Sequence, residues 1–204
     1  MTASEPRDVV LIGDYTYDYP REKLFRRGFD LGGATVHECR FSETSRFPSP
    51  LKLLLLPLFY VRIIRRANTL RTDGVSPDLV VLTKFNPLVI PIVWAYARLS
   101  CCPFVYDLFV SLHRTAEMRD VDPRVVRAVY VIERLTYRLP DRHLVGTDQF
   151  AELYSNMYGL PRSRFVRLPT GADSDWFYPR TDVERRERFT VLYWGNFLPH
   201  HGVG

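Results

Sequence analysis

The sequence predicts an α/β fold: a doubly wound parallel sheet, followed by the first strand of a second domain. Three observations lead to this prediction. Short apolar runs alternate with longer helical segments along the chain, with no repeat period and no low-complexity tract, an order that favours parallel strands joined by right-handed crossovers. The first run, 9–13, is continuously apolar, which is typical of a strand buried on both faces. A charged segment, 181–188, separates the apolar runs 165–168 and 189–194, which indicates a linker.

The elements of the first half follow from residues that begin or end helices. Pro20 and Arg21 begin a helix that reaches Leu31, and Gly32 ends it. A loop over 40–50 contains two prolines that separate the second strand from the next helix. The strands expected in this half lie at 9–13, 34–39 and 78–83, and the helices at 20–31, from 51 onward, and at 86–99.

The second half shows helical periodicity and capping residues. The helix expected over 123–137 has apolar side chains at three- and four-residue intervals, the spacing of one buried helix face. Thr147 caps a helix over 148–158, and Gly159 ends it. The strands expected in this half lie at 103–108, 142–146 and 165–168.

The C-terminal part indicates a domain boundary. Segment 170–188 is mostly polar and charged and cannot form a core of its own, which fits a solvated surface loop as well as an interdomain linker. The run that follows it favours the linker. The apolar run 189–194 leads into a glycine turn, which normally feeds a helix in an α/β unit, and the chain stops before that helix. The expected division is a Rossmann-like domain over 1–169, the linker over 170–188, and the start of a truncated second domain over 189–204.

Two stretches resemble retaining glycosyltransferases of family 4, which have the GT-B fold. Residues 170–173, Thr-Gly-Ala-Asp, with Phe177 and Pro179, are similar to the Asn-Gly-Val-Asp-x-x-x-Phe-x-Pro pattern by which that family leaves its N-terminal domain. The chain departs from it by Thr for Asn and Ala for Val. Residues 192–195, Leu-Tyr-Trp-Gly, followed by Pro199, resemble the first strand and glycine loop of the family's C-terminal, nucleotide-sugar-binding domain. The resemblance covers the whole chain, but only about the first half of a complete enzyme.

The resemblance implies the N-terminal, acceptor-side domain of a transferase. The complete enzyme would move a hexose from a nucleotide-diphosphate sugar to a lipid-linked or polysaccharide acceptor, with retention of configuration and without a metal or other cofactor, in cell-envelope or exopolysaccharide synthesis. Gly171, Gly195 and Asn196 would contact the donor, the last two through backbone N–H groups. The residues that grip the nucleotide in this family are not among these 204. The chain alone is therefore expected to be inactive.

Polar residues gather where the strand 103–108 ends. Asp107 interrupts an apolar strand near its carboxyl end, where open α/β sheets bind ligands. The run that follows resembles a family 4 subset with Phe-Asp-x-Phe-x-Ser-Leu-Tyr-Asp-Thr, with His113 for Tyr and Arg114 for Asp. The resemblance implies that Asp107 is catalytic and positions or deprotonates the acceptor, and a structural carboxylate bonded by backbone or arginine is the alternative. His113 is a second candidate base, and a solvated loop histidine is its alternative.

Candidate acceptor-binding residues come from two loops. Asp14, Tyr15 and Arg21 belong to the loop after the first strand, and Ser111 and Arg114 to the loop after Asp107. Because both loops follow the carboxyl ends of parallel strands, we expect them to line one crevice. The sequence lacks G-x-G-x-x-G and G-x-S-x-G, and its histidines are scattered, so neither a dinucleotide site, a hydrolase nor a metal site is expected.

Composition bears on partners and compartment. The net charge is +5, and almost all of the positively charged residues are arginines. An arginine-rich surface can meet nucleotide diphosphates or anionic lipid, although a compositional bias explains it equally well. No basic stripe indicates a nucleic-acid partner. The cysteines lack Cys-x-x-Cys spacing and the N-terminus lacks an apolar leader, so we expect a cytoplasmic protein, peripheral on the inner face of the cell membrane if it contacts lipid.

Segment 51–66 raises the question of membrane contact. It is nearly all apolar up to residue 64 but contains Lys52, Pro57 and Arg62, and it is too short to span a bilayer. We expect either a core-packing helix with basic ends or an interfacial helix that lies on anionic lipid. The second possibility leads to an alternative function, a non-catalytic module of doubly wound fold that holds anionic lipid or polysaccharide.

Overall fold

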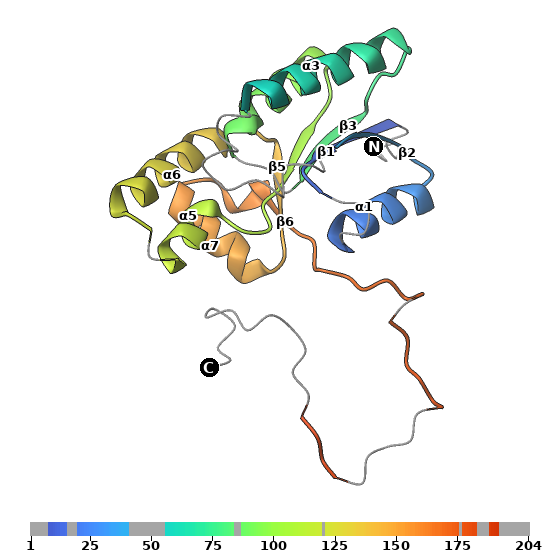
Figure 1. Ribbon diagram of the computed structural model, residues 1–204, viewed down its shortest axis with the longest axis vertical. Coiled ribbons are helices and arrows are strands. Elements are labelled where there is room, and N and C mark those ends of the chain that lie inside the picture. Colours follow the sequence, from blue (N-terminus) through green and yellow to red (C-terminus); the bar gives the residue numbers. More distant parts are fainter. Residues whose placement is uncertain are drawn as a thin grey trace.

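The computed structural model describes residues 8–15, 20–40, 56–83, 87–119, 121–175, 177–182 and 188–191. Six parallel strands form one sheet in the order β2-β1-β3-β4-β5-β6 (Figure 1). The predicted α/β fold with a parallel sheet is thereby confirmed. The strands are β1 (Asp8–Gly13), β2 (Thr35–Arg40), β3 (Leu79–Thr83), β4 (Phe104–Asp107), β5 (Arg142–Val145) and β6 (Phe165–Arg167).

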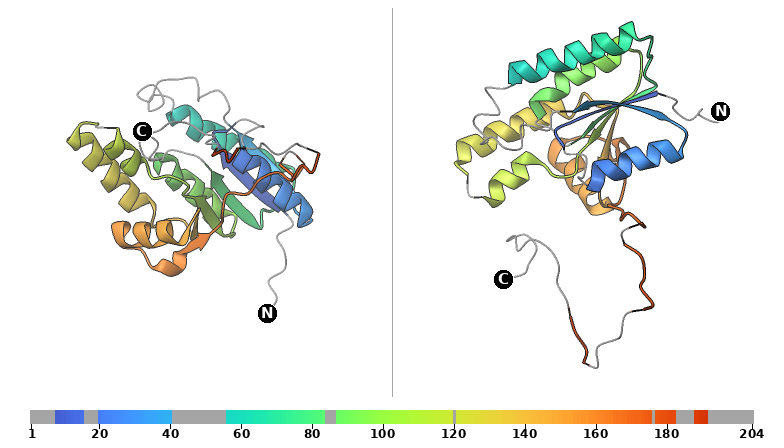
Figure 2. Two further views of the ribbon diagram at one scale, coloured as in Figure 1. Left: turned by 90° about the horizontal axis from the view of Figure 1, so that it is seen from below. Right: turned by 45° about the vertical axis from the view of Figure 1, so that its right-hand side comes forward.

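Helices cover both faces of the sheet. The connection from β1 to β2 runs one way along the sheet and the later connections run the other way, so right-handed crossovers place α1 opposite the later helices. Figure 2 shows α1 on the side of the sheet away from α3. The α-helices are α1 (Pro20–Leu31), α3 (Leu56–Thr72), α4 (Ile90–Leu99), α5 (Leu112–Met118), α6 (Pro123–Thr136) and α7 (Asp148–Tyr158), and two 3-10 turns are η2 (Pro87–Val89) and η3 (Arg162–Arg164).

The core divides along the pleat of the strands. In β1, Val10 and Ile12 belong to the cluster that contains Phe59 of α3 and further residues of α4 and α7. Val9 and Leu11 belong to a smaller cluster on the other face, against which Phe29 of α1 packs. Successive side chains of a strand point to opposite faces, so a strand that is apolar at every position is buried on both faces of the sheet. This explains why 9–13 reads as continuously apolar.

The predicted helix ends hold where the caps are described. Thr147 Oγ1 accepts a hydrogen bond from the Phe150 N–H, and Gly159, with φ of 64°, ends α7 in the left-handed region. Within the described residues, α3 begins at Leu56, and the earlier part of the predicted helix, 51–55, lies outside them. The predicted helix over 86–99 is a 3-10 turn followed by α4.

Helix α5 was not predicted. The sequence predicts a loop at Ser111 and Arg114, whereas Ser111 caps a helix that starts at Leu112, with its Oγ accepting from the Arg114 N–H. The helix has seven residues and none of them is fully buried, so it lacks the apolar stripe by which helices are found.

The chain leaves the sheet after β6, and the described residues of 168–191 contain neither helix nor strand. The predicted strand over 189–194 is wrong for its described part: residues 189–191 are not paired, and Phe189 and Val191 are 95% and 81% exposed. A strand requires a neighbour for its N–H and C=O groups, and none of the six described strands pairs with these residues. Residues 192–194 lie outside the described part, and the division into domains stays a prediction.

Candidate acceptor-side site

Three residues align across the carboxyl edge of the sheet. Gly13 is in register with Thr83, and Thr83 with Asp107, so β1, β3 and β4 end at one level. A Cβ at position 13 would lie 2.3 Å from Thr83 Oγ1 and 2.6 Å from the ring of Tyr15, so only glycine fits there. Within the described residues, the buried Thr83 Oγ1 has no hydrogen-bond partner. The edge is therefore a close-packed row that ends in a carboxylate.

Asp107 is bonded by Arg21, from the first turn of α1. The Arg21 Nε donates to Oδ2 and Nη2 donates to Oδ1, each at 2.7 Å, and the two side chains are 8% and 2% exposed. This is the bidentate, charge-assisted geometry in which a guanidinium recognises a carboxylate. Burial raises the pKa of the Asp107 carboxyl, and the Arg21 hydrogen bonds act to lower it. The structure thus brings these two predicted site residues together as partners of each other.

Two aromatic rings hold the Arg21 guanidinium. Its Cζ lies 4.9 Å from the ring centroid of Phe109 and 5.4 Å from that of Phe25. Both distances are within the range of a cation–π contact. Phe109 belongs to the loop after β4 and Phe25 to α1. The start of α1, the end of β4 and the loop after it are accordingly fixed to one another.

Tyr15 is placed differently from Asp107. Its side chain is 2% exposed and packs with the smaller core cluster on the α1 face, and its hydroxyl donates to Glu38 Oε1 at 3.3 Å. Burial, followed by the Glu38 charge, raises the pKa of Tyr15 above its usual range. Asp14 follows Gly13 directly and is half-buried. Their predicted acceptor-binding roles stay predictions.

A second buried carboxylate, Glu133 of α6, lies beside the loop after β4. It is fully buried, and it accepts hydrogen bonds from the Ser111 hydroxyl at 2.9 Å and from the backbone N–H groups of Leu112 and His113 at 2.7 and 3.3 Å. The hydroxyls of Tyr137 and Tyr158 donate to it at 2.7 and 2.6 Å. Glu133 therefore binds the N-terminus of α5, and its five donors among the described residues are all uncharged.

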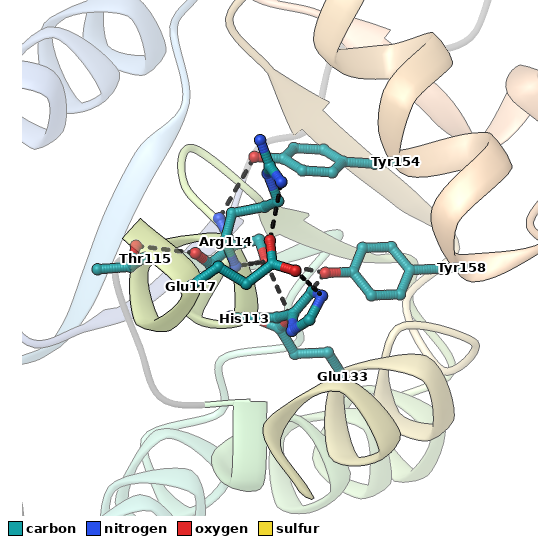
Figure 3. Close-up of polar contacts among 8 residues, drawn as sticks. His113, Arg114, Thr115, Glu117, Glu133, Tyr154 and Tyr158 are labelled. Carbon is teal, nitrogen blue, oxygen red and sulfur yellow. Dashed lines mark hydrogen bonds and ion pairs between the residues drawn. The ribbon is translucent and has the colours of Figure 1, made fainter. Parts of the chain in front are cut away.

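Tyrosines of α7 complete this arrangement. Figure 3 shows the hydroxyls of Tyr154 and Tyr158 pointing at the start of α5, and the Tyr154 hydroxyl accepts from the Ser111 N–H at 3.3 Å. Burial, with the nearby Glu133 charge, raises the pKa of Tyr158 above its usual range. Sequence reasoning missed Glu133, although one signal was available. Glu133 lies four residues before Tyr137 and four after Val129, on the stripe by which α6 was recognised.

His113 and Arg114 lie on α5 beside this network. The His113 ring is 5.1 Å from that of Tyr130, and its Nε2 is 3.4 Å from Glu117 Oε1. The described part of the chain offers no partner to the buried His113 Nδ1. Arg114 Nη1 donates to Glu117 Oε2 at 2.8 Å on the surface. Ser111 is the buried N-cap. The structure thus brings Ser111, His113 and Arg114 together, but their hydrogen bonds within the described residues go to partners other than Asp107.

Comparison with known protein families decides the assignment. The family described as "Glycosyl transferase 4-like domain" matches residues 5–171, which is most of the chain. The chain belongs to this glycosyl transferase 4-like family. The resemblance seen in the sequence is thereby confirmed, and the match ends at Gly171, within the pattern that suggested it. No curated protein matches the sequence.

Some solved structures of low identity are similar to this glycosyl transferase 4-like domain. Anabaena Alr3699/HepE in complex with UDP and glucose has a TM-score of 0.44 and 10% identity over 83% of this chain and 46% of its own. The same protein with UDP alone gives 0.44 and 11% over 83% and 45%. Glycyrrhiza uralensis UGT73P12, complexed with glycyrrhetinic acid 3-O-monoglucuronide, gives 0.44 and 11% over 79% and 48%. The chain spans about half the length of these structures.

In the glycosyl transferase 4-like domain, the segment after β6 is held on α1. Asp173 accepts from Arg27 Nη1 at 2.6 Å and lies 2.9 Å from Lys23 Nζ, and Arg27 also bonds Asp175. Gly171 lies against Leu24 of α1. Gly171 is thus placed on α1, while the other two predicted donor-binding residues, Gly195 and Asn196, lie outside the described residues.

A cavity of about 480 Å³ lies between α1 and the sheet. Phe25 and Phe29 of α1, Val105 and Leu144 of the sheet, and the segment 168–171 form its walls. Its lining is almost wholly apolar, and Arg21, at its border, is bonded to Asp107.

The described residues contain no group of three or more His, Cys, Asp or Glu side chains that would hold a metal ion. Among them, no helix has the length and apolar character required to cross a membrane.

Proposed function

We propose that this chain is the acceptor-side domain of a retaining GT-B glycosyltransferase. The complete enzyme transfers a hexose from a nucleotide-diphosphate sugar to a lipid-linked or polysaccharide acceptor, in cell-envelope or exopolysaccharide synthesis. In this proposal residues 1–169 form the acceptor-side domain, 170–188 the linker, and 189–204 the start of the nucleotide-sugar-binding domain. The acceptor lies at the carboxyl edge of the sheet, near Asp14, Ser111, His113 and Arg114.

The observation that carries this proposal is the family match over 5–171, in a chain whose described strands form one six-stranded parallel sheet. The carboxyl edge supports the placement of the acceptor, because open α/β sheets bind ligands there. The solved structures are about twice as long as this chain. This agrees with a second domain that supplies the donor site, and we propose that the chain alone transfers no sugar.

Sugar transfer tests the proposal directly. The complete protein, incubated with membranes and a panel of radiolabelled nucleotide-diphosphate hexoses, is expected to move label into the lipid or polysaccharide fraction. The anomeric configuration of the product, read by NMR coupling constants, is expected to match that of the donor. Inversion would refute the retaining mechanism, and a lack of transfer from every donor would refute the function. Turnover by the purified 204-residue chain would refute the two-domain requirement.

Peripheral membrane contact is a second part of the proposal, and the outer face of α3 supports it. Phe59 and Ile63 are buried, so one face of the helix packs on the core. Leu58, Val61 and Ile64 are 58%, 44% and 45% exposed and lie three residues apart, on the other side of the helix. Arg62 and Arg65 are exposed beside them. Apolar side chains flanked by arginines are the composition of an interfacial helix on anionic lipid, at the inner face of the cell membrane.

Vesicle co-sedimentation tests the membrane contact. The chain is expected to sediment with vesicles of phosphatidylglycerol and to stay in solution with vesicles of phosphatidylcholine. Arg62→Gln and Arg65→Gln should each weaken binding by about 1 kcal/mol, or roughly fivefold. Arg124→Gln, on the exposed face of α6, is the matched control and should bind as the parent does. Equal binding by all these variants would refute the contact through α3. A chain that binds these vesicles, in a complete protein that transfers no sugar, would instead be the non-catalytic lipid-binding module.

A further inference from the structure

The Arg21–Asp107 pair bears on which group takes the acceptor's proton. A general base must come within hydrogen-bond reach of the proton that it removes. Both oxygens of Asp107 accept from Arg21 at 2.7 Å, and its side chain is only 2% exposed. An acceptor hydroxyl therefore has almost no surface of this carboxylate to approach. Its one strong partner is a permanent cation that already occupies both oxygens in a planar fork.

The pair joins parts of the edge that the sheet does not join. β1 and β4 are separated by β3, and the first turn of α1 follows the loop that leaves β1. Arg21, in the first turn of α1, bonds Asp107 at the end of β4, and Phe109 lies against the same guanidinium. One guanidinium thus fixes the first turn of α1 to the end of β4. The proposed acceptor residues follow the ends of β1 and β4, on the two sides of this link.

We infer that Asp107 acts through Arg21 as a positioning residue, which fixes the start of α1 to the end of β4, and does not itself accept the acceptor's proton. The inference deepens the proposed transferase function, and its statement about the acceptor's proton rests on that function. The positioning can be measured without sugar transfer, so the two halves are tested separately.

The first measurement is NMR on the purified, isotopically labelled chain. The Arg21 Nε–H resonance is expected to be resolved and slow to exchange, and to lose this protection in Asp107→Asn. Amide exchange in α1 residues 22–25 and in 109–111 should rise together, on the order of 100-fold, since a buried ion pair has been broken. The reversed pair, Arg21→Asp with Asp107→Arg, should restore protection at both segments. Unchanged exchange in α1 in the Asp107→Asn variant would overturn the positioning role.

The second measurement is transfer by the complete protein that carries the same variants. Loss of a general base lowers the rate by about 10²- to 10⁴-fold, whereas the reversed pair, which has no carboxylate at position 107, should remain within about tenfold of the parent with the same pH profile. A reversed pair that regains amide protection but is as inactive as Asp107→Asn would overturn the inference and identify Asp107 as the base. If the reversed pair does not fold, Arg21→Met with Asp107→Leu takes its place with the same expectations. If the parent transfers nothing, the proposed function fails while the exchange data still decide the positioning role.

Discussion

Two buried carboxylates lie on either side of the loop after β4, and their negative charges are stabilised by different kinds of hydrogen-bond donor. Asp107 faces a single cation, the Arg21 guanidinium, which bonds both of its oxygens. Glu133 faces five uncharged donors, from two tyrosines, one serine and two backbone N–H groups. One carboxylate is held by charge and the other by the number and direction of dipoles.

The difference shows what each carboxylate organises. The ion pair links two elements, α1 and β4, across an intervening strand. The Glu133 network gathers α6, α7 and the N-terminus of α5 around one point. A buried ion pair can be replaced by apolar residues of similar volume at little loss of stability, whereas a many-membered network leaves several groups unsatisfied when its centre is removed.

Removal of the Glu133 carboxylate should have the largest effect on stability. Glu133→Ala leaves two buried tyrosine hydroxyls, the Ser111 hydroxyl and two N–H groups without their acceptor, and we expect a loss of roughly 5 kcal/mol in the free energy of unfolding. Urea denaturation followed by circular dichroism measures it. Glu152→Ala, on the exposed side of α7, is the control and should change stability by less than about 0.5 kcal/mol. A similar small loss for Glu133→Ala would mean that the network contributes little.

Loss of one partner of the ion pair should come next. Asp107→Asn leaves a buried guanidinium without its charge partner and should lower the free energy of unfolding by about 4 kcal/mol. Replacement of both partners, Arg21→Met with Asp107→Leu, should recover most of that loss because no charge is then buried alone. Denaturant midpoints of the three proteins give the comparison. If the double variant were as unstable as the single one, the pair would not be exchangeable for apolar contacts.

His143 contacts Tyr137, which bonds Glu133, so the pH dependence of stability tests the Glu133 side of the comparison. It is buried between the rings of Tyr137 and Phe165, its Nε2 bonds the Tyr137 carbonyl oxygen, and burial lowers its pKa to about 4. The unfolded state binds the proton first, so the stability contribution of neutral His143 is complete above about pH 6.5 and is lost as pH falls toward 4. The loss is on the order of 3 kcal/mol. Unfolding free energies measured at several pH values should show this slope, and His143→Phe should flatten it. An unchanged slope in His143→Phe would contradict the assignment.

The smallest effect is expected for an ion pair on the surface. Asp173→Asn breaks contacts with Lys23 and Arg27, whose side chains are 41% and 40% exposed, and should lower the stability less than any of the single variants of buried residues above. Because exposed charges are screened by salt, the difference should vanish at about 0.5 M salt, while that of Asp107→Asn should persist. Thermal unfolding at two salt concentrations tests this. A salt-independent loss for Asp173→Asn would mean that the segment after β6 is held by more than its charges.

The contrast also explains what the sequence could and could not predict. The strands were predictable because each is a short apolar run with its own turn signals, and Asp107 stood out as a carboxylate in such a run. Its partner could not be inferred from the sequence, because Arg21 is 86 positions away and only the crossover topology brings α1 to β4. Arg21 was selected by its loop, for a different role.

The features that were missed lack a local signal. Glu133 lies among arginines in a helix that otherwise reads as amphipathic, and its burial depends on tyrosines of α7 and on the start of α5. Helix α5 depends in turn on Ser111 and Glu133 to bind its first N–H groups. A short helix stabilised by distant side chains is a tertiary feature, so periodicity does not reveal it.

Chemical-shift mapping with an acceptor tests the central claim most directly. Titration of the ¹⁵N-labelled chain with a soluble short-chain lipid-linked sugar and with neutral oligosaccharides should shift the amide signals of Gly13, Asp14 and residues 109–114, at the carboxyl edge of the sheet. Signals of α3 and α4 should stay in place. Shifts confined to α3 and α4, or no shift with any of these ligands, would contradict an acceptor site at this edge.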